Sequence, residues 1–163
     1  MEGHVPTSLK ELQIISLLKK DGLDFNIEKN YRPVSNLSFL SKLLERIAAS
    51  RLLSHMDKHH LYLAFQSAYK QHHSVETVII RVQADILKAV DNKKLVLLIL
   101  LDLSAAFDTI DHAILIALLK SLIGVDGKAL DWFKSYLAAR RQSVLIYDKA
   151  SYPWDLVFGV PQG

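Results

Sequence analysis

The sequence of 163 residues contains no cysteine, which excludes disulfide bonds and metal sites built on thiolates. It also lacks a long hydrophobic run. No run exceeds seven residues, the length of Leu95–Leu101, whereas a membrane-spanning helix needs roughly 20. The N-terminal residues show no basic segment followed by an apolar stretch, so we expect no signal peptide. Walker-type phosphate loops, Ser-His-Asp patterns and Rossmann glycine fingerprints are missing too.

What the sequence does contain is typical of a folded domain. Hydrophobic residues make up 50% of the chain and charged residues 23%, which is enough apolar material for a core. The formal net charge of +3 is compatible with nucleic-acid binding but does not require it. The length allows one domain, or one domain and part of another.

Apolar residues spaced three and four positions apart predict helices. The first runs over 37–52, and the second over 75–90 with Ser74 as its N-cap. Asp111 predicts the start of a third helix, which ends before Gly124. Asp126 predicts the start of a fourth, which continues to Leu137.

Strand signals are shorter. The run Leu95–Leu101 predicts a strand buried on both faces, because its apolar residues do not alternate with polar ones. Residues 143–147 and 154–158 are typical of short strands, while 8–20 fits a helix or a strand. The sequence therefore predicts an α/β fold, with a central strand between helices.

Three acidic residues follow the predicted buried strand within ten positions: Asp102, Asp108 and Asp111. A carboxylate at the end of a buried strand is held rigidly at the edge of a sheet, where ligands bind. Such carboxylates suit a hard cation such as Mg²⁺, which keeps waters and substrate phosphates as further ligands. The alternatives are a polar strand end, a turn residue and a helix cap, respectively.

At these residues the sequence resembles a known family, the reverse transcriptases of LINE-type (non-LTR) retrotransposons. Asp102–His112 resembles the family's first catalytic motif. Further stretches match the fingers, the linking helix and turn, and the nucleotide-contact loop in the family's order: Asn30–Ser35 followed by Lys42–Arg46, Gln66–Lys70 followed by Ser74, Trp132–Leu137 with Arg140–Gln142, and Gly159–Gly163.

The resemblance implies an RNA-directed DNA polymerase, a nucleotidyltransferase that uses two Mg²⁺ ions. Residues 1–94 would be a helical, fingers-like region, and 95–163 the first part of a palm sheet flanked by helices. Implied partners are an RNA template, a DNA primer and deoxynucleoside triphosphates, and the implied location is the nucleus or cytoplasm. We expect no membrane association.

The family's other catalytic aspartates form an adjacent pair downstream of Gly159–Gly163, and the sequence contains no such pair. We therefore expect a chain truncated before the rest of the palm and the thumb, which does not polymerise DNA alone. The alternatives are a non-catalytic relic that binds RNA or a protein, and a chain that does not fold stably by itself. We also expect poor solubility.

The resemblance assigns roles residue by residue. Asp102 would be the first metal-binding aspartate, with the Leu103 backbone carbonyl beside it. Phe107 would lie under the nucleotide sugar and exclude a 2′-hydroxyl; the alternative is a plain core aromatic. Gln162 and Gly163 would lie against the incoming nucleotide and template.

Several other polar residues carry open interpretations. Arg32 and Lys70 would contact triphosphate or template, and the alternative for both is a solvated surface charge. His55 and His59 could bind a metal on one helix face. Arg140–Arg141 could touch a nucleic-acid backbone, or lie in a solvated turn.

Overall fold

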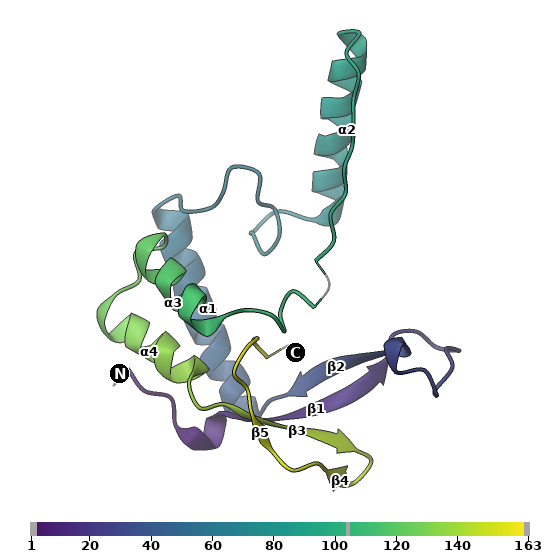
Figure 1. The fold of residues 1–163 in the computed structure, drawn as a ribbon. Helices are drawn as coiled ribbons and strands as arrows, with labels where there is room; N and C mark the ends of the chain where they lie inside the picture. Colours follow the sequence, from purple (N-terminus) through teal and green to yellow (C-terminus); the bar gives the residue numbers. More distant parts are fainter. Residues whose placement is uncertain (1–2, 104, 162–163) are drawn as a thin grey trace. The chain divides into compact units, whose positions relative to one another are not determined.

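The computed structural model describes residues 3–103 and 105–161, which form two compact units. The first unit consists of Met1–His59 and Ala105–Gly163, and the second of His60–Ser104. The described residues are helices and a mixed sheet, which confirms the predicted α/β class (Figure 1). No helix among them is both long and apolar enough to cross a membrane.

The sheet of the first unit is built around one central strand. That strand, β1 (Glu11–Leu18), lies between an antiparallel neighbour and a parallel one (Figure 1). Its partners and the two short strands beyond them are β2 (Tyr31–Asn36), β3 (Arg141–Ile146), β4 (Lys149–Ala150) and β5 (Trp154–Asp155). The ambiguous stretch 8–20 thus contains a strand, Glu11–Leu18, and its first two residues belong to a short 3-10 helix, Thr7–Leu9. The strand predicted over 154–158 is shorter than expected, because only Trp154 and Asp155 pair with β3.

Two of the three helices among the described residues of the first unit begin at the caps that the sequence predicts, Asp111 and Asp126, and the third begins at Ser38, for which no cap was predicted. The helices are α1 (Phe39–Lys58), α3 (His112–Ser121) and α4 (Gly127–Leu137). The Asp111 carboxylate accepts a hydrogen bond from the Ile114 amide at 3.0 Å, and Asp126 accepts one from the Gly127 amide at 2.8 Å. Both contacts satisfy amides that a helix leaves without partners at its start.

An apolar core holds these helices together. Its buried members are Leu119, Val125 and Leu130, and the half-buried side chains packed against them are Leu52, Leu115, Ile116, Ile123 and Phe133. These residues come from α1, α3, α4 and the α3–α4 connection. Each fully buried Leu or Val contributes about 1.5–3 kcal/mol, so the core fixes α3 relative to its neighbours.

Two cations are buried where the sheet meets α4. The Lys10 ammonium donates to the Ala138 carbonyl at 3.2 Å, and burial, together with the Arg140 guanidinium, lowers the pKa of Lys10. Arg140 is fully buried; its Nη1 donates to the Tyr136 carbonyl at 3.1 Å, and its guanidinium lies 4.4 Å from the Tyr136 ring centroid. Within the described part of the chain, Arg140 Nε and Nη2 have no hydrogen-bond partner.

The Arg140→Met substitution is expected to raise the free energy of unfolding by about 1–3 kcal/mol. Removing a buried charge without a carboxylate partner relieves a desolvation cost of several kcal/mol, which exceeds the loss of one hydrogen bond and one cation–π contact. Denaturant unfolding would measure the difference. Arg141→Met is the matched control, because the Arg141 side chain is half exposed and its loss should change stability by at most about 0.5 kcal/mol. A less stable Arg140→Met protein would contradict the expectation.

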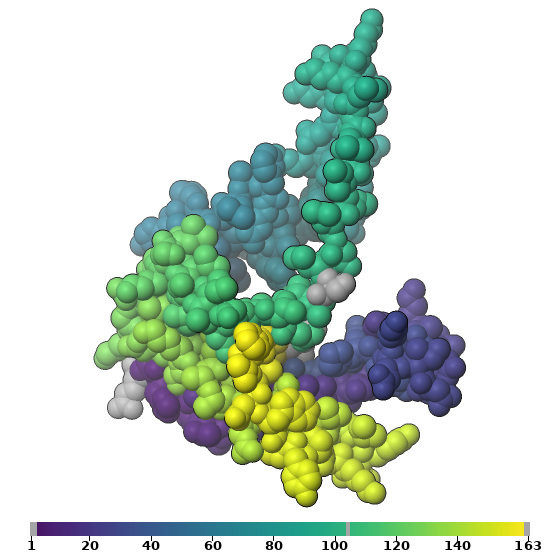
Figure 2. Space-filling model, in the orientation of Figure 1, coloured from purple at the N-terminus to yellow at the C-terminus, as the bar shows by residue number. Residues whose placement is uncertain are grey.

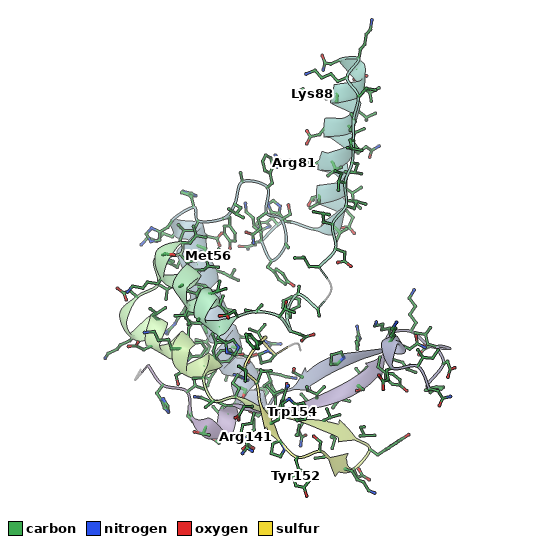
Figure 3. All side chains as sticks on the ribbon, viewed as in Figure 1. Met56, Arg81, Lys88, Arg141, Tyr152 and Trp154 are labelled. Atoms are coloured by element: carbon green, nitrogen blue, oxygen red, sulfur yellow. The ribbon has the colours of Figure 1, made fainter. Side chains whose placement is uncertain are left out.

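The second unit contains one helix, α2 (Val75–Asp91), among its described residues. Its start forms a capping box, in which the Ser74 hydroxyl accepts from the Thr77 amide at 3.3 Å and the Thr77 hydroxyl accepts from the Ser74 amide at 2.9 Å. The predicted helix and its cap are confirmed. Arg81 and Lys88 project from this helix (Figure 3), and the Arg81 guanidinium lies 5.2 Å from the Phe65 ring centroid.

The prediction of a buried strand over Leu95–Leu101 is wrong. These residues have no regular secondary structure, and their side chains are exposed, Leu95 completely and Leu101 by 90%. A strand forms only when a neighbour accepts and donates its ladder hydrogen bonds, and no strand among the described residues pairs with this stretch. Residues 1–94 were expected to be helical, but they also contain the strands β1 and β2. The division of the chain into a fingers-like region, 1–94, and a partial palm, 95–163, stays a prediction.

Candidate functional site

Two motifs that are far apart in the sequence meet in the first unit. The turn at 105–111 lies within Asp102–His112, the predicted first catalytic motif, and the loop at 158–161 contains the start of the predicted nucleotide-contact loop. Asp111 and Phe158 form an isolated antiparallel bridge. The Gly159 amide donates to the Ile110 carbonyl at 2.8 Å, and the Val160 amide donates to the Phe107 carbonyl at 2.9 Å. In the space-filling view the yellow C-terminal residues lie against the green segment that follows residue 104 (Figure 2).

The loop lies so close to the turn that only glycine fits at position 159. Its φ of +84° lies in the left-handed region, which side chains other than glycine disfavour. A Cβ atom at this position would lie 2.9 Å from both the Cα and the carbonyl oxygen of Asp108. Because those atoms are backbone, they cannot rotate away, and the loop can approach the turn only with glycine here.

His112 adds a side-chain contact to the same loop. Its Nε2 donates to the Gly159 carbonyl oxygen at 2.7 Å, so this nitrogen carries the proton. Sequence reasoning assigned His112 no role, although it is the last residue of the motif Asp102–His112. Its position directly after the N-cap Asp111 was the available signal, since a side chain there is fixed by the start of a helix.

Phe107 lies in a tight turn that is hydrogen-bonded to this loop. The Asp108 amide donates to the Ala105 carbonyl at 2.9 Å, and the Thr109 hydroxyl donates to the same carbonyl at 3.3 Å. The Phe107 side chain is 42% exposed, more than a core aromatic would be. The turn therefore restrains the backbone at Phe107, while part of its side chain is exposed to solvent.

The other predicted site residues are distributed over both units. Asp102 and Leu103 are exposed and belong to the second unit, so the structure does not gather them with Phe107 in one unit. Gln162 and Gly163 lie outside the described residues.

The two predicted cationic contacts also differ in their surroundings. Arg32 is exposed on β2, opposite Leu17 of β1. Lys70 is half-buried in the second unit, with its ammonium 5.3 Å from the Tyr62 ring centroid.

A complete metal site is not present in the described part of the chain, where no three His, Cys, Asp or Glu side chains are grouped to hold a metal ion. The Asp102 carboxylate and the Leu103 carbonyl are hard oxygen donors of the type that Mg²⁺ prefers. They are too few to fix an octahedral ion, so the fit to a resident metal is incomplete. His55 uses its Nε2 for the Ile123 carbonyl at 2.9 Å, a hydrogen bond that joins α1 to the α3–α4 connection.

The suggestion that both arginines of the pair at 140–141 touch a nucleic-acid backbone is wrong for Arg140, which is fully buried on the Tyr136 ring. Arg141 is exposed instead, and its Nε lies 3.8 Å from the Asp155 carboxylate of β5. Figure 3 shows Arg141 beside Trp154 at this end of the sheet. The tandem arginines alone could not reveal that one of them packs against α4.

Comparison with known proteins identifies the family. The family described as reverse transcriptase (RNA-dependent DNA polymerase) matches residues 17–163. The probable RNA-directed DNA polymerase from transposon BS of Drosophila melanogaster is 34% identical over 94% of this chain. The RNA-directed DNA polymerase from the mobile element jockey of the same species is 30% identical over 99% of the chain.

A more distant relative is the retrovirus-related Pol polyprotein from type-1 retrotransposable element R2 of Popillia japonica, 30% identical over 77% of the chain. The chain spans 17% of the length of each of these three relatives. The resemblance read from the motifs is confirmed: this chain belongs to the reverse transcriptase (RNA-dependent DNA polymerase) family, and its relatives are polymerases of non-LTR retrotransposons.

Proposed function

We propose that this chain supplies the nucleotide-contact part of an RNA-directed DNA polymerase of a non-LTR retrotransposon. The observation that carries the proposal is the pairing of the turn at 105–111 with the loop at 158–161, through an isolated bridge and two backbone hydrogen bonds. The side chain of His112, next to the turn, adds a third hydrogen bond. This pairing joins two family motifs that are nearly 50 residues apart, as a site shared by both motifs requires. Its substrates would be an RNA template, a DNA primer and deoxynucleoside triphosphates.

In this proposal Phe107 selects the sugar. Its backbone carbonyl accepts a hydrogen bond from the Val160 amide, which ties the backbone that carries this partly exposed ring to the loop. A bulky ring under the sugar would leave no room for a 2′-hydroxyl, and deoxynucleotides would therefore be preferred. Gln162 and Gly163 continue the same loop and would contact the nucleotide and the template.

Asp102 and the Leu103 carbonyl would be ligands of Mg²⁺, which in nucleotidyl transfer stabilises charge on the attacking and leaving oxygens. The family's activity is usually metal-dependent. These two donors alone would leave the ion to be completed by further ligands. That the 163 residues alone do not polymerise DNA stays a prediction.

Binding to an RNA–DNA primer–template tests the proposal, with fluorescence anisotropy as the measurement. We expect Arg32→Ala and Lys70→Ala each to weaken binding about threefold or more, and to reduce the salt slope by about 1, because each would remove a phosphate contact. The matched control is Lys149→Ala, an exposed cation on β4 that has no predicted role.

The outcomes test the roles of Arg32 and Lys70 separately from nucleic-acid binding by the chain as a whole. If both variants bind like Lys149→Ala, the assignment of Arg32 and Lys70 to nucleic acid is wrong. If the unaltered chain does not bind the primer–template even at low salt, the proposed role of the chain itself is wrong. Binding without any primer extension is the result expected of a non-catalytic module.

A further inference from the structure

Both backbone polar groups of Gly159 are hydrogen-bonded. Its N–H donates to the Ile110 carbonyl at 2.8 Å, and its C=O accepts from His112 Nε2 at 2.7 Å. Gly159 is itself buried. Leaving a buried carbonyl without a partner costs more free energy than an ordinary hydrogen bond contributes.

The donor that holds this carbonyl is itself rigidly placed. His112 is the first residue of α3, whose start is fixed by the Asp111 cap and whose body is anchored in the core by Leu119. The His112 ring is half-buried against the loop. A donor mounted on a packed helix keeps its direction better than a donor in a loop.

One step further along the loop, the Val160 amide holds the Phe107 carbonyl. The contacts therefore form a chain from the helix α3 through His112 and Gly159 to Val160 and Phe107. A loop that detaches at Gly159 would also release the backbone of Phe107.

We propose that His112 is a positioning residue, which holds the loop at 158–161 against the turn that carries Phe107. It thereby helps to fix the ring that distinguishes deoxyribose from ribose in an incoming nucleoside triphosphate. This inference rests on the proposed function for its ligand, but the clamp itself can be measured without one.

Amide hydrogen exchange tests the clamp with no nucleotide present. His112→Phe keeps a ring but removes the donor, and should speed exchange at Gly159 and Val160 roughly tenfold. His112→Gln places an amide donor near the position of Nε2 and should restore most of the protection. The Leu122 amide, which bonds to the Leu118 carbonyl in α3, should be unchanged and reports that the helix is intact.

The matched control is His55→Phe. His55 Nε2 also bonds to a backbone carbonyl, that of Ile123, in the same unit. This variant should leave exchange at Gly159 and Val160 unchanged. Unchanged exchange there in His112→Phe, or equal acceleration in His55→Phe, would overturn the clamp, as would a His112→Gln protein as unprotected as His112→Phe.

Nucleotide selection tests the consequence. With primer–template and Mg²⁺ present, dGTP and GTP are titrated against each variant. His112→Phe should reduce the preference for dGTP about threefold or more, and His112→Gln should restore it. An unchanged preference would overturn the role of His112 in selection. If the unaltered chain binds neither nucleotide, the proposed function fails, whereas the exchange result still decides the clamp.

Discussion

Gly159→Ala is expected to lower the free energy of unfolding of the first unit by about 2–5 kcal/mol. A left-handed backbone conformation at alanine costs about 1–2 kcal/mol, and forcing an extra methyl group into a packed site costs about 1–3 kcal/mol. Both terms apply, since Gly159 has a φ of +84° and its Cβ would lie 2.9 Å from the Asp108 backbone. Thermal or denaturant unfolding, followed by circular dichroism, gives the difference.

Gly124→Ala is the control that separates strain from crowding. Gly124 has a φ of +75° in the same unit, but no atom lies within 4 Å of the position of its Cβ. Only the conformational term applies there, so the loss should be about 1–2 kcal/mol. Equal losses at the two glycines would contradict the close contact between the loop and the turn.

The local features of the fold were predictable from the sequence because they depend on neighbouring residues. The caps Ser74, Asp111 and Asp126 are confirmed, since a side-chain oxygen next to the first amides of a helix acts within one turn. The helices of the first unit followed from apolar residues at helical spacing. Residues of all three helices pack into the core, but of the predicted face of α1 only Leu52 does so, and Leu40 and Leu43 are exposed. The helix α1 also continues six residues beyond the predicted end.

The non-local features were not predictable in the same way. Within 8–20, the strand β1 pairs with β2 on one side and with β3 on the other, where Gln13 lies opposite Ser143, 130 residues away. Leu95–Leu101 has the composition of a strand, but composition does not supply a partner. The same holds for the candidate site, because the contact of His112 with Gly159 depends on two segments meeting in space. Motif resemblance predicted which segments matter, but not the bonds between them.

The exposed stretch Leu95–Leu101 is expected to make the chain self-associate. Leu97 and Leu100 are each 84% exposed, and the backbone around them has no strand partner among the described residues. Unpaired, apolar and extended chain is a template for pairing with another copy. We expect the unaltered chain to self-associate through this stretch, in agreement with the poor solubility predicted from the sequence.

Replacing both leucines by lysine, Leu97→Lys with Leu100→Lys, should raise the concentration at which the chain self-associates by tenfold or more. Each leucine that is buried in an intermolecular contact contributes about 1.5–3 kcal/mol, and two like charges at the contact oppose it. Sedimentation velocity over a concentration series measures the change. The melting of the first unit should be unaffected, because both side chains are already exposed.

A second double variant with the same change in charge shows whether the position matters. Leu122 and Val157 are 60% and 64% exposed in the first unit, outside the stretch, and can both be replaced by lysine. If general repulsion between more positive chains suppressed association, this variant would behave like the first. If association depends on the open stretch at 95–101, it would associate like the unaltered chain, and only the Leu97 and Leu100 substitutions would disperse it.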